Sequence, residues 1–317
     1  MGVYVARRVI VSLPVLLGLS MLVFTILQLP PGGPVDFYAS QSSRLSDADR
    51  RAIEQLFGLD RPRPVQYLRW LTAVLQGNWG RSYQDGRRVT TVIGERLPPS
   101  LQLAAASLLI AVFAAIPLGI FAASRGGGFC RYAIDIASIL GISMPSFWLG
   151  LVGILVFSRW LGLLPTGGMY TFGARRTLLD GLQHLAMPAV VASAYWVAAW
   201  SRYVRGSLLE VIRQDFVRTA RAKGLSEAVV LRRHTLRNAL MPLVTLVGLR
   251  LPSLLSGVIV VEIVFSWPGV GLLLYHSMLS RDYPVLMGCL MGVAALVITG
   301  NLVADVLYTI VDPRIRY

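Results

Sequence analysis

The sequence DFVRTARAKGLSEAVVLRRHTLRNALMP, residues Asp215 to Pro242, is a polar, arginine-rich segment between two apolar stretches. Most of the remaining chain is apolar: of 317 residues, 55% are hydrophobic and 15% are charged. Soluble domains carry about 25% charged residues. The chain is therefore predicted to be an all-α, polytopic membrane protein in which this segment joins two membrane spans.

The basic charge is attributed to membrane topology rather than to nucleic-acid binding. The net charge is +14, and Lys223 is the only lysine. The sequence has no basic face with interleaved aromatic residues and no known nucleic-acid module. The two cysteines, Cys130 and Cys289, are expected to be free thiols, because they do not form a disulfide framework.

Six apolar stretches are predicted to cross the core of a bilayer, which takes about 20 residues; the fourth is the weakest. The predicted spans are Val9–Leu29, Ser100–Ala123, Ile134–Phe157, Met187–Ser201, Leu240–Phe265 and Val285–Val311. The fourth is expected to continue as a helix past Arg202. The distribution of arginine over the short loops predicts that both termini and the loop 205–239 face the cytoplasm.

The segment from Pro30 to Pro99 is too long for a simple connection and is predicted to form a small helical extracytoplasmic domain. One helix is expected after an N-cap at Ser46–Asp49, and a second from Pro64 to a stop at Gly77. The expected apolar stripes are Ile53, Leu56 and Phe57 before Gly58, and Val65, Leu68, Leu71 and Leu75. Two roles stay open: a cap that receives a substrate-delivering protein, or a collar that packs over the outer helix ends.

Catalytic motifs are absent from the sequence. It has no G-x-x-x-x-G-K-[ST] phosphate loop, no H-E-x-x-H zinc motif and no G-x-S-x-G nucleophile turn. The three histidines, His184, His234 and His276, lack metal-ligand spacing. We therefore expect no catalytic residue, no metal and no ATP hydrolysis on this chain. Proton-coupled secondary transport is disfavoured because none of the acids is well placed in mid-membrane.

Three residues of the spans are candidates for the transport pathway or its gate: Arg250, Glu262 and Pro145. Arg250 lies about ten residues, or about 15 Å, from the cytoplasmic end of its span. An arginine at this depth costs about 2.5–3.5 kcal/mol to insert, so it should face the bundle interior or an aqueous path. It either attracts a substrate carboxylate or forms an interhelical or intersubunit pair. Glu262 lies near the outer end of span five, and Pro145 can kink a span.

The loop 205–239 is predicted to form an elbow of two helices. A short basic helix over Arg213–Lys223 ends at Gly224, in a left-handed C-cap position. Ser226 is expected to cap the second helix, with Glu227 in its first turn. The expected tip is Ala220, Ala222 and Leu225, surrounded by Arg218, Arg221 and Lys223. Such a surface suits a groove on a soluble partner; the alternative is a basic loop held only by lipid headgroups.

Long motifs along the whole chain resemble one protein family. RTARAKGLS followed by RHTLRNALMP resembles the cytoplasmic EAA loop of permease subunits of binding-protein-dependent ABC importers, in detail the dipeptide, oligopeptide and nickel branch. YVARRVIVSLPVLLGLSMLVF, LFGLDRPRPVQYLRWLTAVLQGNWGRSY and NLVADVLYTIVDPRIRY are also similar to that branch. The sequence departs from it at Pro30–Pro34, where Leu-Pro-Gly-Asp-Pro is usual, and at Arg250, where a neutral residue is expected.

The resemblance implies the six-helix fold of type I ABC importer permeases. The implied divisions are a first transmembrane helix (1–29), an extracytoplasmic helical domain (30–99), a five-helix core (100–311) with the coupling loop 205–239, and a cytoplasmic tail (312–317). The implied ATPase contact is Arg218, Thr219, Ala220, Arg221, Ala222, Lys223, Gly224 and Leu225.

The resemblance also implies the function and the partners. The chain would be a non-catalytic subunit in the bacterial plasma membrane and would form half of a translocation pathway for short peptides. An extracytoplasmic solute-binding protein would deliver the peptides, and a homologous second permease subunit would complete the pathway. ATP and Mg would be bound by two cytoplasmic ATPase subunits, so no cofactor is expected on this chain. Nickel or another small solute is the alternative cargo.

Overall fold

The computed structural model describes residues 2–29, 46, 48–49, 51–52, 60–124 and 129–311. Within its helices, the side chains of residues 2–6, 124, 129–131, 244–245, 249–257 and 305–311 lie outside the described part. The described residues are mostly helical and contain no named β-strand, which confirms the all-α class. Two compact units are present: residues 1–98 with 268–302, and residues 99–267 with 303–316.

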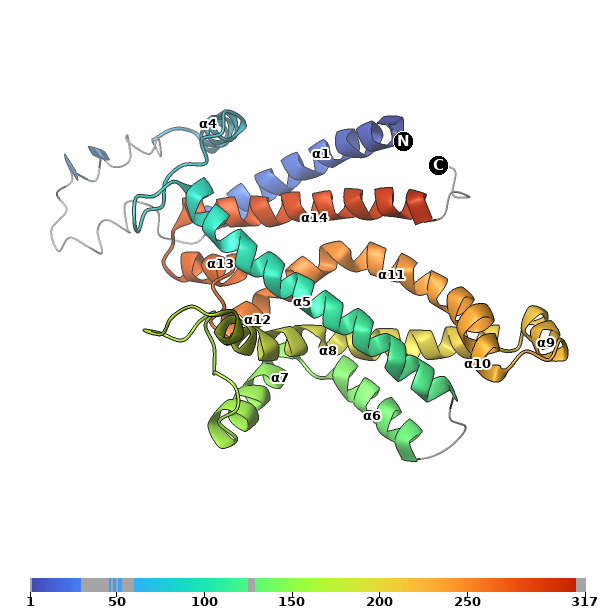
Figure 1. Cartoon of the computed structure of the whole chain (residues 1–317). Helices are drawn as coiled ribbons and strands as arrows, with labels where there is room; N and C mark the ends of the chain where they lie inside the picture. Colours follow the sequence, from blue (N-terminus) through green and yellow to red (C-terminus); the bar gives the residue numbers. More distant parts are fainter. Residues whose placement is uncertain are drawn as a thin grey trace. The chain divides into compact units, whose positions relative to one another are not determined.

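The first unit contains α1 (Gly2–Leu27), α4 (Arg63–Leu75) and α13 (Val270–Leu279), with the start of α5 (Val89–Ser124) and most of α14 (Tyr283–Val311) (Figure 1). Because α5 begins at Val89, the last residues of the predicted outer domain form one helix with the second predicted span. The predicted outer segment and the second predicted span are thus joined by one uninterrupted helix.

The second unit is built around α8 (Leu178–Val211), along which α6 (Phe129–Ser143) and α11 (Leu236–Gly257) pack. The other elements of this unit are the rest of α5, α7 (Ser146–Gly153), the π-helix η1 (Ile154–Trp160), α9 (Asp215–Ala222), α10 (Glu227–Val229), the π-helix η2 (Val230–Thr235) and α12 (Ile259–Val264). Helix α8 runs well past Arg202, so the predicted continuation of the fourth span is confirmed.

The described helices include four that are long and apolar enough to cross a membrane: Arg7–Leu27, Val89–Ala123, Leu178–Val211 and Tyr283–Ala304. A fifth is present if α6 and α7 with η1 count as one span, although they are bent by 112°. The number of six spans therefore stays a prediction.

The predicted span Ile134–Phe157 is interrupted at Met144 and Pro145, where the helix breaks, so the expected effect of Pro145 is confirmed and the crossing itself stays a prediction. A proline has no backbone N–H and disfavours helical geometry in the residue before it. Here Pro145 is the extended N-cap residue of α7, with φ −61° and ψ 139°. The stretch is thus a broken span or a re-entrant loop.

Part of the predicted outer domain is described. The amide and hydroxyl of Ser46 donate to the Asp49 carboxylate, and the Asp49 amide donates back to the Ser46 hydroxyl at 3.2 Å. This reciprocal cap confirms the predicted helix start. The predicted stripe Ile53, Leu56 and Phe57 and the stop at Gly58 lie outside the described residues.

Helix α4 has the predicted length but a different buried face. It spans Arg63–Leu75, and Gly77 follows in the left-handed region with φ +82°. Of the predicted stripe, Val65, Leu68 and Leu75 are exposed, whereas Tyr67 is buried. The Tyr67 and Ser20 hydroxyls lie 2.8 Å apart, and Phe24 of α1 packs edge-on against the Tyr67 ring. The contacts of Tyr67 with Ser20 and Phe24 on α1 thus determine which face of α4 is buried.

The second unit has a core that joins α5, α8 and α11. Helices α5 and α8 approach closely at Gly119: a Cβ there would lie 2.7 Å from the Cβ of Val204 and 2.8 Å from the carbonyl oxygen of Ser201. Ordinary carbon contacts are about 3.5–4.0 Å. Glycine is therefore required for the observed packing of these two helices.

We expect Gly119→Leu to destabilise the protein by about 1–3 kcal/mol, because the added side chain has no space between α5 and α8. The measurement is the thermal unfolding midpoint of the purified protein in detergent. The matched control is Gly206→Ala on α8, where a Cβ meets nothing within 4 Å. An unchanged midpoint for Gly119→Leu would show that the two helices do not pack in this way.

Candidate functional site

Helix α9 and the turn after it form the first arm of the elbow. Asp215 lies in the first turn and Arg221 in the last, and both charges favour the helix dipole. Lys223 is the C-cap residue, and the Gly224 amide donates to the Arg221 carbonyl at 2.9 Å. Gly224 has φ +76°, so the predicted left-handed position is confirmed. The chain reverses here because glycine adopts this conformation without steric cost.

The second arm returns through α10 and η2 into α11. Ser226 is the N-cap residue of α10, but its side chain makes no capping hydrogen bond, so that part of the prediction is wrong. Its carbonyl instead accepts from the amides of Val229 and Val230. The Thr235 hydroxyl donates to the Val230 carbonyl at 3.2 Å and closes the wider turn of η2.

The inner face of the elbow is a packed core. Val217 and Ala220 of α9 are buried together with Val230, and this cluster continues into Leu208 of α8 and Ala239 of α11. The prediction that Ala220 lies at the exposed tip is therefore wrong, because this residue faces the returning arm. The Ser207 hydroxyl also donates to the Ala239 carbonyl at 2.9 Å. The core of the elbow is thus continuous with that of two long helices.

The outer face of the elbow is exposed and basic. Its exposed members among the predicted contact residues are Arg218, Thr219, Arg221, Ala222, Lys223, Gly224 and Leu225. Arg221 spans the bend and donates to both carboxylate oxygens of Glu227, at 2.7 and 3.2 Å. Arg218 lies 3.6 Å from Asp215, and both side chains are highly exposed.

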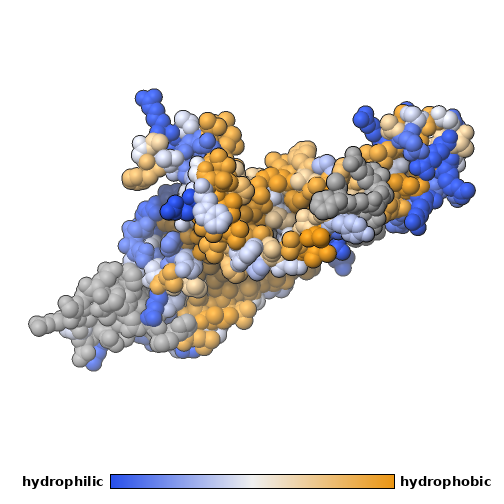
Figure 2. Space-filling view, turned by 90° about the horizontal axis from the view of Figure 1, so that it is seen from below, coloured by the Kyte–Doolittle hydropathy of each residue, from blue (hydrophilic) through white to orange (hydrophobic). Residues whose placement is uncertain are grey.

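The elbow lies at one end of its unit, away from the apolar surface of the long helices. In Figure 1, α9 lies beyond one end of α8 and α11. In Figure 2, many atoms at the α9 end are hydrophilic, whereas the adjoining helices are mostly hydrophobic. The elbow is therefore a polar projection at the end of long apolar helices, which suits contact with a soluble partner.

The three pathway candidates lie in different settings. Pro145 stands at the break between α6 and α7. Glu262 on α12 is fully buried, and the Ser100 hydroxyl donates to its carboxylate at 2.6 Å. The indole of Trp267 donates to the Pro99 carbonyl at 2.9 Å, which gives a second link between the same two segments. Arg250 belongs to α11, but its side chain lies outside the described residues.

Sequence reasoning missed the residues that anchor the elbow and one ion pair in the spans. Val217 gives no local signal, because its burial depends on Val230 across the turn. Asp135 of α6 likewise gives no local signal of its partner: Arg205 of α8 donates to its carboxylate at 2.5 Å. A comparison of the charged residues on neighbouring spans, looking for opposite signs, would have found this pair.

These features define a polytopic α-helical membrane protein with a polar elbow at the end of its long helices. Two family models cover nearly the whole chain. Residues 1–104 match the N-terminal model, "Binding-prot-dependent transport system membrane comp, N-term", and residues 115–317 match "Binding-protein-dependent transport system inner membrane component". The chain belongs to this family of inner membrane components of binding-protein-dependent transport systems.

Full-length relatives agree with the family assignment. The chain is 43% identical to the oligopeptide transport system permease protein AppB of Bacillus subtilis (strain 168), over 100% of both chains. It is 44% identical to a putative peptide permease protein of Brucella suis biovar 1, over 99% of this chain and 98% of the relative. The di/tripeptide transport system permease protein DppB of Pseudomonas aeruginosa is 36% identical over 99% of this chain and 98% of its own.

Proposed function

We propose that this chain is a permease subunit of an ATP-driven importer and forms half of the translocation pathway for short peptides. The observation that carries the proposal is the elbow core: Val217, Ala220 and Val230 join an exposed basic surface to α8 and α11. The peptide cargo is supported by the names of the full-length relatives, which are oligopeptide and di/tripeptide permeases.

The elbow would act as a lever between a soluble motor and the spans. Its exposed face, from Arg218 to Leu225, contacts one of two cytoplasmic ATPase subunits, and the buried face moves with α8 and α11. ATP and Mg are bound and used on those subunits. A homologous second permease completes the pathway, and a solute-binding protein delivers cargo outside. Both termini and the elbow lie in the cytoplasm of a bacterium, as the arginine distribution favours.

The pathway candidates have distinct proposed roles. Glu262 is buried against Ser100, so we assign it to holding α12 against α5 at a gate rather than to contacting cargo. Pro145 creates the break that shapes the α6–α7 stretch. Arg250 either contacts a cargo carboxylate or pairs with another helix or subunit.

Uptake into proteoliposomes tests the proposed function. The full permease would be reconstituted with its second permease, its ATPase subunits and its binding protein, and supplied with labelled di- and oligopeptides. We expect uptake that requires ATP and the binding protein. A parallel assay with a nickel chelate tests the alternative cargo. Peptide uptake driven by a proton gradient without ATP would contradict the proposal and favour a stand-alone transporter.

A further inference from the structure

Two arginines of the outer segment are placed opposite each other. Arg81 and Arg88 form an isolated antiparallel β-bridge. The bridge is flanked by hydrogen bonds from the Ser82 amide to the Arg87 carbonyl and from the Val89 amide to the Gly80 carbonyl. This pattern makes Arg81 and Arg88 a non-hydrogen-bonded pair, in which side chains lie closest together. Like charges in this arrangement repel each other.

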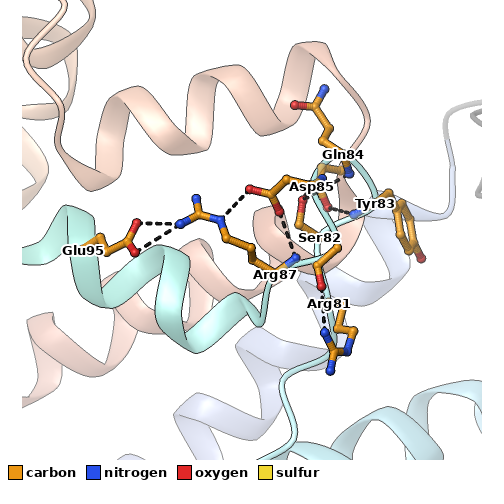
Figure 3. A network of polar contacts seen from close by, with 9 residues as sticks. Arg81, Ser82, Tyr83, Gln84, Asp85, Arg87 and Glu95 are labelled. Atoms are coloured by element: carbon orange, nitrogen blue, oxygen red, sulfur yellow. Dashed lines mark hydrogen bonds and ion pairs between the residues drawn. The ribbon is translucent and has the colours of Figure 1, made fainter.

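Among the described residues, the acids at this hairpin are engaged by other groups. Arg87 donates to Asp85 at 2.8 Å and to both carboxylate oxygens of Glu95, at 3.1 and 2.9 Å. The side-chain hydrogen bond from Arg87 lowers the pKa of Asp85, which keeps this acid charged and paired. Figure 3 shows Arg87 reaching between Asp85 and Glu95, while Arg81 lies apart from both. The carboxylates are therefore used by Arg87, not by the Arg81–Arg88 pair.

A third acid holds the hairpin in place. The buried carboxylate of Asp282 accepts from the Ser82 hydroxyl at 2.5 Å and from the Tyr83 amide at 3.2 Å. Trp79 packs against the apolar cluster that contains Val89 and Val285. These contacts hold the backbone on both sides of Arg81 against the rest of the unit.

The two arginines line a cavity of about 360 Å³, together with Asn78, Trp79 and Thr90. Arg81 donates once to the Gly86 carbonyl at 2.9 Å, which leaves most of its five donors available. Within the part of the chain that the structure describes, no carboxylate lies within ion-pair distance of Arg81 or Arg88. The cavity thus brings two arginines together with polar neighbours, and no described carboxylate pairs with either arginine.

We propose that this Arg81–Arg88 cavity receives an acidic side chain of the solute-binding protein that delivers cargo to the permease. The inference rests on the proposed function, which places residues 30–99 outside. A guanidinium group binds a carboxylate through bidentate hydrogen bonds. The repulsion between two guanidinium groups is relieved when a carboxylate lies between them. The hairpin supplies a defined contact for one protruding side chain rather than a large apolar surface.

The test measures the affinity of the assembled importer for its binding protein. The complex would be held in nanodiscs and titrated with the binding protein that supports ATP-dependent uptake. We expect Arg81→Gln with Arg88→Gln to raise the Kd by roughly fivefold to thirtyfold and to weaken its salt dependence. The control Arg87→Gln removes one positive charge, against two in the double variant, from the acid-paired face of the same hairpin, and it should leave the Kd within about twofold.

The outcomes separate the proposal from its alternatives. Unchanged affinity of the double variant, with unchanged basal ATPase activity, would overturn the proposal. If the variant instead loses uptake of peptides with a free C-terminal carboxylate but not of amidated ones, at unchanged affinity, the site belongs to the cargo and the assignment to the binding protein is wrong. A wild-type complex without ATP-dependent peptide uptake would defeat the proposed function itself.

Discussion

Gly224→Val is expected to reduce ATP-dependent uptake by about tenfold or more, because the left-handed conformation costs a side-chain-bearing residue about 1–2 kcal/mol. Gly224 has φ +76°, and a Cβ added there would meet nothing within 4 Å. The cost therefore comes from the backbone alone and not from a clash. A change in backbone direction here would reorient α9 relative to α10, and with it the exposed face of the elbow.

The matched variant is Gly224→Asn. Asparagine visits the left-handed region readily, and the open surroundings accept its side chain. We expect this variant to keep most of the uptake, at equal amounts of assembled complex. Equal activity of the valine and asparagine variants would show that the bend does not need this conformation.

Val217→Asp is expected to separate ATP hydrolysis from transport or to prevent assembly. The side chain of Val217 is fully buried, between α9 and the core of α8 and α11. A carboxylate at this position would be desolvated without a built-in partner, at a cost of at least about 3 kcal/mol. The measurement is uptake and cargo-stimulated ATPase activity of the same reconstituted complex.

The control is Gln214→Asp, which adds the same charge three residues away at the exposed N-cap position of α9, outside the proposed ATPase contact. We expect this variant to assemble normally. Should Val217→Asp retain full uptake and stimulation, the buried face of α9 would not be the connection between the motor and the spans.

The parts of the elbow that local signals control could be predicted from the sequence. A glycine after a basic last turn predicted the left-handed stop at Gly224, and the structure has it. The orientation of the helix could not be predicted in the same way. Ala220 is a small residue between arginines, and only the packing of Val230 across the turn decides that it is buried.

Contacts between segments far apart in the chain also could not be predicted from sequence patterns. Ser100 and Glu262 are 162 residues apart, and nothing in either neighbourhood points to the other. Pro145 was recognised as a possible kink, but the 112° bend depends on how α7 packs on α8 and α12. The pairing of Arg81 with Arg88 could be recognised only from the β-bridge in the structure, because the sequence alone does not say which arginine faces the acids.

The π-helix η2 has a consequence for how this region can change during evolution. A π turn holds one more residue than an α turn, so it shifts the phase of everything after it by about 100°. Here η2 covers Val230–Thr235, directly between the elbow and α11. The loss of a single residue from this turn would leave a continuous α-helix but rotate α11 about its axis relative to α9. The length of this segment is therefore as constrained as its composition, and related chains should align through it without gaps.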